Sequence, residues 1–289
     1  MQKNRTVERL LYAEVVDMGG MPVRQPLPTN QVEQLDPFLL LHHHKTSIPE
    51  AAIPHKSGVG PHPHRGFSPV TFVYQGGVHH RDSRGNDSVV YAGGTQWMNA
   101  GRGIVHSERP PQDIQERGGV QEIIQLWINS PRANKMDQPS YIPLQAEDTP
   151  TITTDEGKAT IGVVAGNYEG VQGPVKTASP ILALRLELQA GATSRIPLPQ
   201  DYNAFLYLLD GRIMLEGFGL VEGHYLVLLN RDGEGCTLTA SENTRLLVMA
   251  GKPLEEPLAM HGPFVMNSQT ELMQAMRDYQ MGKMGILIE

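Results

Sequence analysis

Two short stretches in the first half of the chain, PHPHRGF at residues 61–67 and QWMNAGRGIVHSE at residues 96–108, contain the residues that predict the fold and the chemistry. Each stretch holds two potential metal ligands two residues apart: His62 and His64 in the first, His106 and Glu108 in the second. Side chains two residues apart on a β-strand point to the same side. We therefore expect the four side chains to enter one interior and share one metal ion.

The donor set of three imidazoles and one carboxylate indicates which ion could bind. Such borderline-to-hard donors suit Fe, Mn, Ni, Cu, Co or Zn better than Ca or Mg. Four protein ligands in an octahedral shell leave two positions for water, substrate or dioxygen. A closed structural zinc site is more often rich in thiolate, and the single cysteine, Cys236, is distant in sequence. The pattern predicts one divalent transition metal, although either pair alone would be a weak signal.

Short apolar runs recur along the whole chain and are separated by Gly-Gly, Gly-Asn and Asp-Gly turn signals. This spacing favours a β-sandwich or barrel over alternating strands and helices. One helix is expected over residues 268–281, because Ser268 and Glu271 form a capping box. The expected strands are 70–75, 89–91, 96–99, 123–128, 161–165, 182–188, 205–209, 225–229, 237–240 and 245–250.

The length of 289 residues is typical of about two domains. Residues 130–149 are rich in proline and polar residues and are the expected linker. We expect a metal-binding barrel over residues 1–135 and a second barrel, with the terminal helix, over residues 136–289. A faint internal repeat supports this division. It sets Pro197 and Pro199 against His62 and His64, and Cys236 and Leu238 against His106 and Glu108, so we expect the second barrel to lack metal ligands.

The composition limits the function classes. A net charge of −7 disfavours non-specific nucleic-acid binding but is compatible with a protein partner. One cysteine allows no intramolecular disulfide and fits a reducing compartment. The first residues show no signal-peptide pattern, and no apolar run approaches the roughly 20 residues that span a bilayer. We expect no membrane association and a cytoplasmic location, and a nuclear location is left open because a nuclear address would be invisible in this sequence.

The two ligand stretches closely resemble those of the pirin family. Asp36-Pro37-Phe38, Gln125–Asn129 and Gly262–Asn267 extend the resemblance from about Asp36 to Gly282. The family consists of bicupins with iron in the N-terminal barrel and no metal in the C-terminal one. The resemblance implies an all-β fold of two antiparallel jelly-roll barrels with a short C-terminal helix. It also implies iron as the ion and assigns the ligands as His62, His64, His106 and Glu108.

Two classes of function follow from this resemblance. Pirins resemble quercetin 2,3-dioxygenases, which open the central ring of flavonols and release carbon monoxide. The first hypothesis is therefore an enzyme for a small aromatic chelating substrate and dioxygen, with Glu108 as general base near or on the metal. The second is an iron-binding, redox-responsive regulatory protein that acts as a transcription cofactor through protein partners. A non-redox cupin, such as a sugar isomerase with Zn or Mn, is a third reading.

Other residues are given structural interpretations. His42-His43-His44 follows an apolar strand and is interpreted as a solvated turn rather than a second metal site. His80 is interpreted as a surface residue of a hairpin, with support of a ligand as the alternative. The remaining candidates are packing or ion-pair residues. Cys236, Trp97 and Trp127 are interpreted as core residues, with either tryptophan as an alternative pocket wall. Arg65 and Arg102 are each interpreted as the partner of a carboxylate that orients a ligand.

Overall fold

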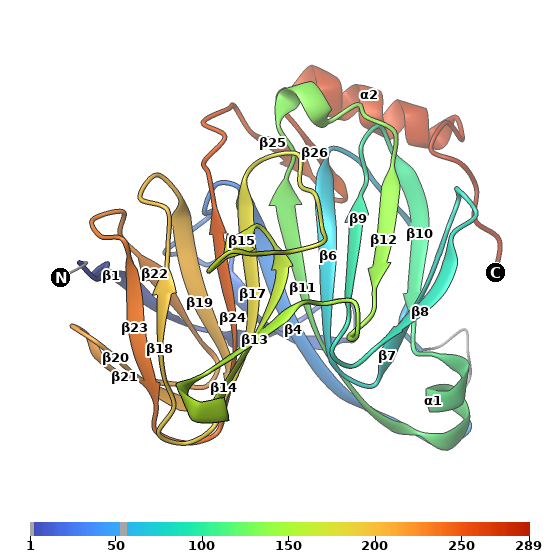
Figure 1. Cartoon of the computed structure of the whole chain (residues 1–289). Coiled ribbons are helices and arrows are strands. Elements are labelled where there is room, and N and C mark those ends of the chain that lie inside the picture. The colour runs from blue at the N-terminus through green and yellow to red at the C-terminus, as the bar shows by residue number, and fades with distance from the viewer. Residues whose placement is uncertain (1–2, 53–56) are drawn as a thin grey trace. The chain divides into compact units, whose positions relative to one another are not determined.

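A computed structural model of the chain describes residues 3–52 and 57–289 (Figure 1). The chain divides into two compact units. We call Phe38–Glu147 with Leu254–Glu289 the histidine unit, and Met1–Pro37 with Asp148–Pro253 the apolar unit. The expected domains, residues 1–135 and 136–289, are each contiguous in sequence. In the structure, the N-terminal segment Met1–Pro37 belongs to the apolar unit and the C-terminal segment Leu254–Glu289 belongs to the histidine unit.

The histidine unit contains two large antiparallel sheets and one two-stranded antiparallel sheet in its C-terminal segment. Five strands follow the order β12-β9-β6-β11-β4, and four follow the order β5-β10-β7-β8. The elements are β4 (Phe38–Ile48), β5 (Val59–His64), β6 (Phe67–Gln75), β7 (Gly77–Asp82), β8 (Asp87–Tyr91), β9 (Thr95–Asn99), β10 (Ile104–Arg109), α1 (Gln112–Arg117), β11 (Gly119–Asn129), η2 (Arg132–Asn134), β12 (Ser140–Leu144), β25 (Ala259–His261), β26 (Phe264–Met266) and α2 (Gln269–Gln280).

The apolar unit repeats this plan with a seven-stranded sheet, β1-β22-β19-β24-β17-β14-β13, and a four-stranded sheet, β18-β23-β20-β21. The elements are β1 (Val7–Tyr12), β2 (Glu14–Asp17), β3 (Pro22–Leu27), β13 (Thr151–Thr154), η3 (Asp155–Gly157), β14 (Ala159–Ala165), β15 (Asn167–Tyr168), β16 (Val171–Gln172), β17 (Ile181–Leu188), β18 (Thr193–Pro197), β19 (Asn203–Asp210), β20 (Arg212–Leu215), β21 (Gly219–Glu222), β22 (Tyr225–Leu229), β23 (Gly235–Ala240) and β24 (Thr244–Gly251).

The predicted all-β jelly-roll fold with a short terminal helix is confirmed, and every expected strand lies within an observed one. In the described part of the chain, the two large sheets of each unit remain separate and do not close into one hydrogen-bonded barrel. The predicted capping box is present in part: Ser268 Oγ accepts a hydrogen bond from the Glu271 amide, whereas the Glu271 carboxylate accepts from the Asn267 amide rather than from that of Ser268. The expected linker, residues 130–149, is partly ordered, because β12 pairs with β9. Among the described residues, helices long and apolar enough to cross a bilayer are absent.

The strand ladders give the register of the internal repeat, since β4 to β11 and β17 to β24 follow the same sheet orders. His106 pairs with His62, whereas Cys236 pairs with Ile196. The counterpart of His62 is therefore Ile196 and not Pro197, one residue away from the alignment drawn from the sequence. A one-residue slip moves every side chain to the opposite face. Accordingly, Ile196 is buried and Pro197 is exposed.

Candidate metal centre

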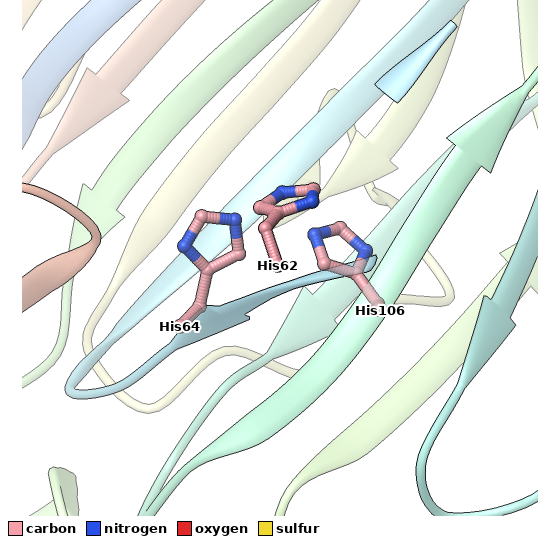
Figure 2. A group of neighbouring side chains, drawn as sticks. All are labelled: His62, His64 and His106. Atoms are coloured by element: carbon pink, nitrogen blue, oxygen red, sulfur yellow. The ribbon is translucent and has the colours of Figure 1, made fainter. Parts of the chain in front are cut away.

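Three histidines of the four-stranded sheet meet in the histidine unit. His62 and His64 lie on β5, and His106 lies on the neighbouring strand β10, directly opposite His62. One ligand atom from each ring lies within 4.8 Å of the other two. Figure 2 shows the three rings turned toward one another. The two-residue spacing in β5 places both of its imidazoles on one side, as the sequence predicts.

The outer nitrogen of each ring has a hydrogen-bond partner. His62 Nδ1 lies 2.8 Å from the Gly60 carbonyl oxygen, and His64 Nδ1 lies 3.4 Å from the Pro263 carbonyl oxygen. A carbonyl oxygen only accepts, so the hydrogen of each neutral ring is on Nδ1 and the lone pair is on Nε2. Imidazole ligands of metals are commonly oriented in this way by a partner on the other nitrogen.

Burial keeps the rings of His64 and His106 neutral. It lowers the pKa of His64 well below its ordinary value, and a charge on His62 would lower it further. Burial has the same effect on the pKa of His106, reinforced by His62, His64 and His80. His106 Nε2 is buried and has no hydrogen-bond partner within the described part of the chain. Neutral rings with free Nε2 atoms, one of them otherwise unsatisfied, fit a divalent transition metal.

Glu108 lies two residues beyond His106 on β10, but it is not part of the three-histidine group. Its carboxylate is held by two neutral donors from the larger sheet. Thr71 Oγ1 donates to Oε1 at 2.9 Å, and Gln125 Nε2 donates to Oε2 at 2.7 Å. The carboxylate therefore links the two sheets and keeps lone pairs for a further interaction, because each oxygen can accept more than once.

Sequence reasoning misinterpreted His80 as a surface residue. Its side chain is only 1% exposed, because β7 pairs with β10 and sets His80 opposite Glu108. It contacts both His106 and Asp82. The alternative, that His80 supports a ligand, is the one that the contacts favour. The His80-x-Asp82 spacing, the same as in the ligand pairs, was the available signal.

The turn between β5 and β6 is held by the C-terminal segment of the unit. Gly66 has a φ of +85°, and a Cβ there would lie 1.9 Å from the Val265 carbonyl oxygen, so only glycine fits. Arg65 forms a buried ion pair with the Asp278 carboxylate at 3.0 Å. That carboxylate also accepts from Gln274 and Lys283, so the expected ion pair is present but its contacts in the described ranges do not reach a proposed ligand. Arg102 contributes its backbone carbonyl, which accepts from Arg65 Nε at 2.7 Å.

The His42-His43-His44 segment is not a turn but the middle of β4. Pairing with β11 orders the segment, and both His42 and His43 are buried. His43 Nε2 lies 3.3 Å from Glu122 Oε1. Within the described ranges, the three-histidine group is the one cluster with metal-ligand geometry, so nothing indicates a second metal at His42–His44.

Two packing interpretations were correct, and one residue has a further contact. Cys236 is buried, and burial raises the pKa of its thiol to about 12. Trp97 is buried as expected. Trp127 contacts His64, with ring centroids 5.5 Å apart, and also contacts Phe67. Trp127 therefore forms an aromatic wall beside the histidines, as the alternative interpretation allowed.

Comparison with known proteins gives consistent results. Residues 20–128 match the family model described as Pirin, and residues 183–285 match the Pirin C-terminal cupin domain. Pirin-like protein 2 of Arabidopsis thaliana is 35% identical, over 98% of this chain and 86% of that protein. Pirin of Mus musculus is 34% identical, over 96% and 92%. The crystal structure of quercetin 2,3-dioxygenase from Acinetobacter baumannii matches with a TM-score of 0.92 and 34% identity, covering 99% of this chain and 100% of that one.

Proposed function

The chain belongs to the pirin family, and from this membership we propose that it is a metal-dependent dioxygenase that opens flavonols such as quercetin with molecular oxygen. The observation that carries the proposal is the group of three imidazoles whose free nitrogens converge. The similarity to a solved structure named quercetin 2,3-dioxygenase supports the choice of substrate. Fold similarity alone would not, because one fold hosts many reactions.

The proposed ligands are His62, His64, His106 and Glu108, and the proposed ion is iron. Manganese, nickel, copper, cobalt and zinc suit the same donors. A bound redox-active ion with open coordination positions would anchor a chelating substrate and activate dioxygen. Glu108 joins the set through the lone pairs that Thr71 and Gln125 leave available.

The chain's own residues would bind, orient and deprotonate the substrate. Glu108 is the proposed general base, which accepts the proton of the flavonol hydroxyl. Its two donors hold the carboxylate in one orientation, which lowers the entropic cost of using it as a base. Trp127 and Phe67 supply an apolar wall beside His64, which excludes water and offers a flat surface to an aromatic ring.

The test begins with metal-free protein loaded with Fe(II), with metal content measured before quercetin is added in air. We expect metal-dependent loss of flavonol absorbance together with equimolar oxygen uptake. In Glu108→Gln we expect kcat to fall by about 100-fold or more, because general bases typically contribute that much. The matched control is Glu147→Gln, which changes an exposed carboxylate in the same unit.

The outcomes separate the proposed roles. Glu108→Gln that keeps its metal and loses turnover identifies a base, whereas loss of the metal identifies a ligand. Full turnover with metal bound would remove Glu108 from catalysis. Full iron occupancy in the unaltered chain without flavonol turnover would contradict the enzyme and leave the iron-binding regulatory protein as the remaining hypothesis.

A further inference from the structure

His106 contacts a second buried histidine on the side away from the proposed metal. Its Nδ1 lies 3.4 Å from His80 Nδ1, and His80 Nε2 lies 3.0 Å from Asp82 Oδ2. The register of β7 against β10 explains this arrangement, because it sets Asp82 opposite His106. The three side chains therefore form a continuous chain from a carboxylate to a proposed ligand.

Asp82 is held as a carboxylate despite its burial. Burial acts to raise its pKa, but hydrogen bonds from His80, from the Asn86 side chain and from two backbone amides outweigh this and lower the pKa below its ordinary value. Asn86 Nδ2 donates at 2.7 Å, and the Arg84 amide donates at 2.8 Å. An ionised carboxylate with these partners only accepts hydrogen bonds.

The positions of the ring hydrogens in His80 and His106 follow from the ionised Asp82 carboxylate. His80 Nε2 donates to Asp82, so a neutral His80 keeps its lone pair on Nδ1. His106 Nδ1 must then carry the hydrogen and donate to His80. The remaining lone pair of His106 is on Nε2, the buried atom that has no other partner in the described ranges.

We propose that His80, held by Asp82, is a positioning residue of the metal centre: it fixes His106 as the Nδ1–H tautomer and thereby presents Nε2 to the ion. This inference rests on the proposed metal site and extends it by one residue pair. No proton moves in this role. The carboxylate at the far end also makes His106 a better electron donor, as carboxylate–histidine pairs do at other metal sites.

The packing around His80 fits a ring held in one orientation. Tyr141 stacks on His80 with ring centroids 3.8 Å apart and an interplanar angle of 7°. The Tyr141 hydroxyl lies 3.0 Å from Ser88 Oγ, which anchors the stacking ring in turn. His80 is therefore constrained in its plane by stacking and along its edge by Asp82.

His106 differs from the other two histidines in the kind of partner that orients it. His62 and His64 are oriented by backbone carbonyls, which no side-chain substitution removes. His106 depends on a side chain, so its orientation can be tested by substitution. The repeat supplies the variant: Glu108 pairs with His80 and Leu238 pairs with Leu215, so leucine occupies the position of His80 in the apolar unit.

The first experiment needs no metal. Two-bond ¹H–¹⁵N spectra of the metal-free chain at about pH 8, where histidine is ordinarily neutral, report which nitrogen carries the hydrogen. We expect His106 to be the Nδ1–H tautomer in the unaltered chain. In His80→Leu we expect a shift toward the Nε2–H form, because Nδ1–H loses its acceptor. His80→Gln, whose amide can accept from His106 and donate to Asp82, should retain the Nδ1–H form.

The second experiment measures Co(II) affinity by chelator competition, together with the visible spectrum of the bound ion. We expect His80→Leu to weaken binding by about 10- to 100-fold, as loss of a partner behind a ligand does, and His80→Gln to recover most of that loss. His79→Gln, which alters an outward neighbour paired with Asp87, should bind as the unaltered chain does. Thermal unfolding of each metal-free variant separates affinity from folding.

Two results would overturn the inference: an Nε2–H His106 in the unaltered chain, or a His80→Leu variant with unchanged tautomer and unchanged affinity. Recovery of the tautomer and affinity in His80→Gln supports positioning over mere packing. Neither measurement uses turnover. Failure to oxidise flavonols would therefore count against the proposed enzyme but not against the role of His80. If the protein fails to bind cobalt, the tautomer of His106 alone tests that role.

Discussion

The two units share one ladder of strands but differ at the positions that face their interiors. At nine polar interior positions of the histidine unit, the apolar unit has an apolar residue that belongs to a single buried core cluster. The paired positions, from the strand registers, are His42 and Leu184, His62 and Ile196, His64 and Leu198, Thr71 and Leu206, His80 and Leu215, Gln96 and Val227, His106 and Cys236, Glu108 and Leu238, and Gln125 and Val248.

The same pattern of strand pairing therefore supports either a polar or an apolar interior in this fold. The apolar unit is stabilised by one continuous core, at roughly 1.5–3 kcal/mol for each large side chain removed from water. The histidine unit instead has a polar centre whose groups bond to one another across its sheets. These buried polar groups are stable only while they keep their partners, because an unpartnered polar group in a low-dielectric interior is costly.

We expect the largest effect when one interior residue of the apolar unit is replaced by its polar counterpart from the histidine unit. Leu206→Thr places there the residue that the histidine unit has at Thr71. We expect a loss of about 3–5 kcal/mol in the free energy of unfolding of the apolar unit, because a cavity and an unpartnered hydroxyl are created together. Hydrogen exchange of the β19 and β24 amides measures this directly.

The control for Leu206→Thr is Leu220→Thr, at a position 46% exposed on β21, where we expect a change within about 0.5 kcal/mol. Both tryptophans, Trp97 and Trp127, lie in the histidine unit. Their fluorescence should therefore report that unit separately. Equal effects of the two substitutions on exchange would show that the apolar interior is not what stabilises its unit.

The next effect concerns the histidine unit, where His106→Ala removes one of the proposed metal ligands. We expect Co(II) or Fe(II) affinity to fall by more than about 100-fold, since removing a ligand must exceed the 10- to 100-fold cost of removing a partner behind one. Chelator competition measures the loss, and thermal unfolding of the metal-free protein checks the fold. Retained affinity would show that the ion binds elsewhere.

The reciprocal variant Cys236→His sharpens the same point. It introduces an imidazole at the position of His106, but the neighbours there are Ile196, Leu198 and Leu238, which are buried and apolar. We expect no metal binding by the apolar unit of this variant, measured in the His106→Ala background. Metal binding by this variant would mean that one imidazole is enough to bind the ion, and that a cluster of three histidines is not required.

The sequence predicts that His62, His64 and His106 meet in one interior, as they do in the structure, but it predicts their surroundings poorly, for physical reasons. His62 and His64 are two residues apart on one strand, so their common orientation is a local property. The contact between His80 and His106 depends on the register of β7 against β10, which is set by long-range pairing. The same limit explains the misaligned Pro197, because a shift of one residue changes the face without changing the apolar pattern appreciably.

The most gradual expected effect is a difference in acid sensitivity between the units, which is spread over a wide pH range and carried in part by His42. Burial lowers the pKa of His42 to about 4, whereas an unfolded histidine titrates near 6.5. As the pH falls from about 6.5 to about 4, His42 binds a proton in the unfolded chain but not in the folded one. The free energy of unfolding therefore falls by up to roughly 1.4 kcal/mol per pH unit.

His42→Leu introduces the residue found at Leu184 and should remove that contribution. We expect a shallower slope of unfolding free energy against pH when metal-free protein is unfolded in urea and followed by tryptophan fluorescence. Replacing the exposed His261 with glutamine should leave the slope as it is, and a His42→Leu slope equal to that of the unaltered chain would show that this buried ring is not a source of the acid sensitivity.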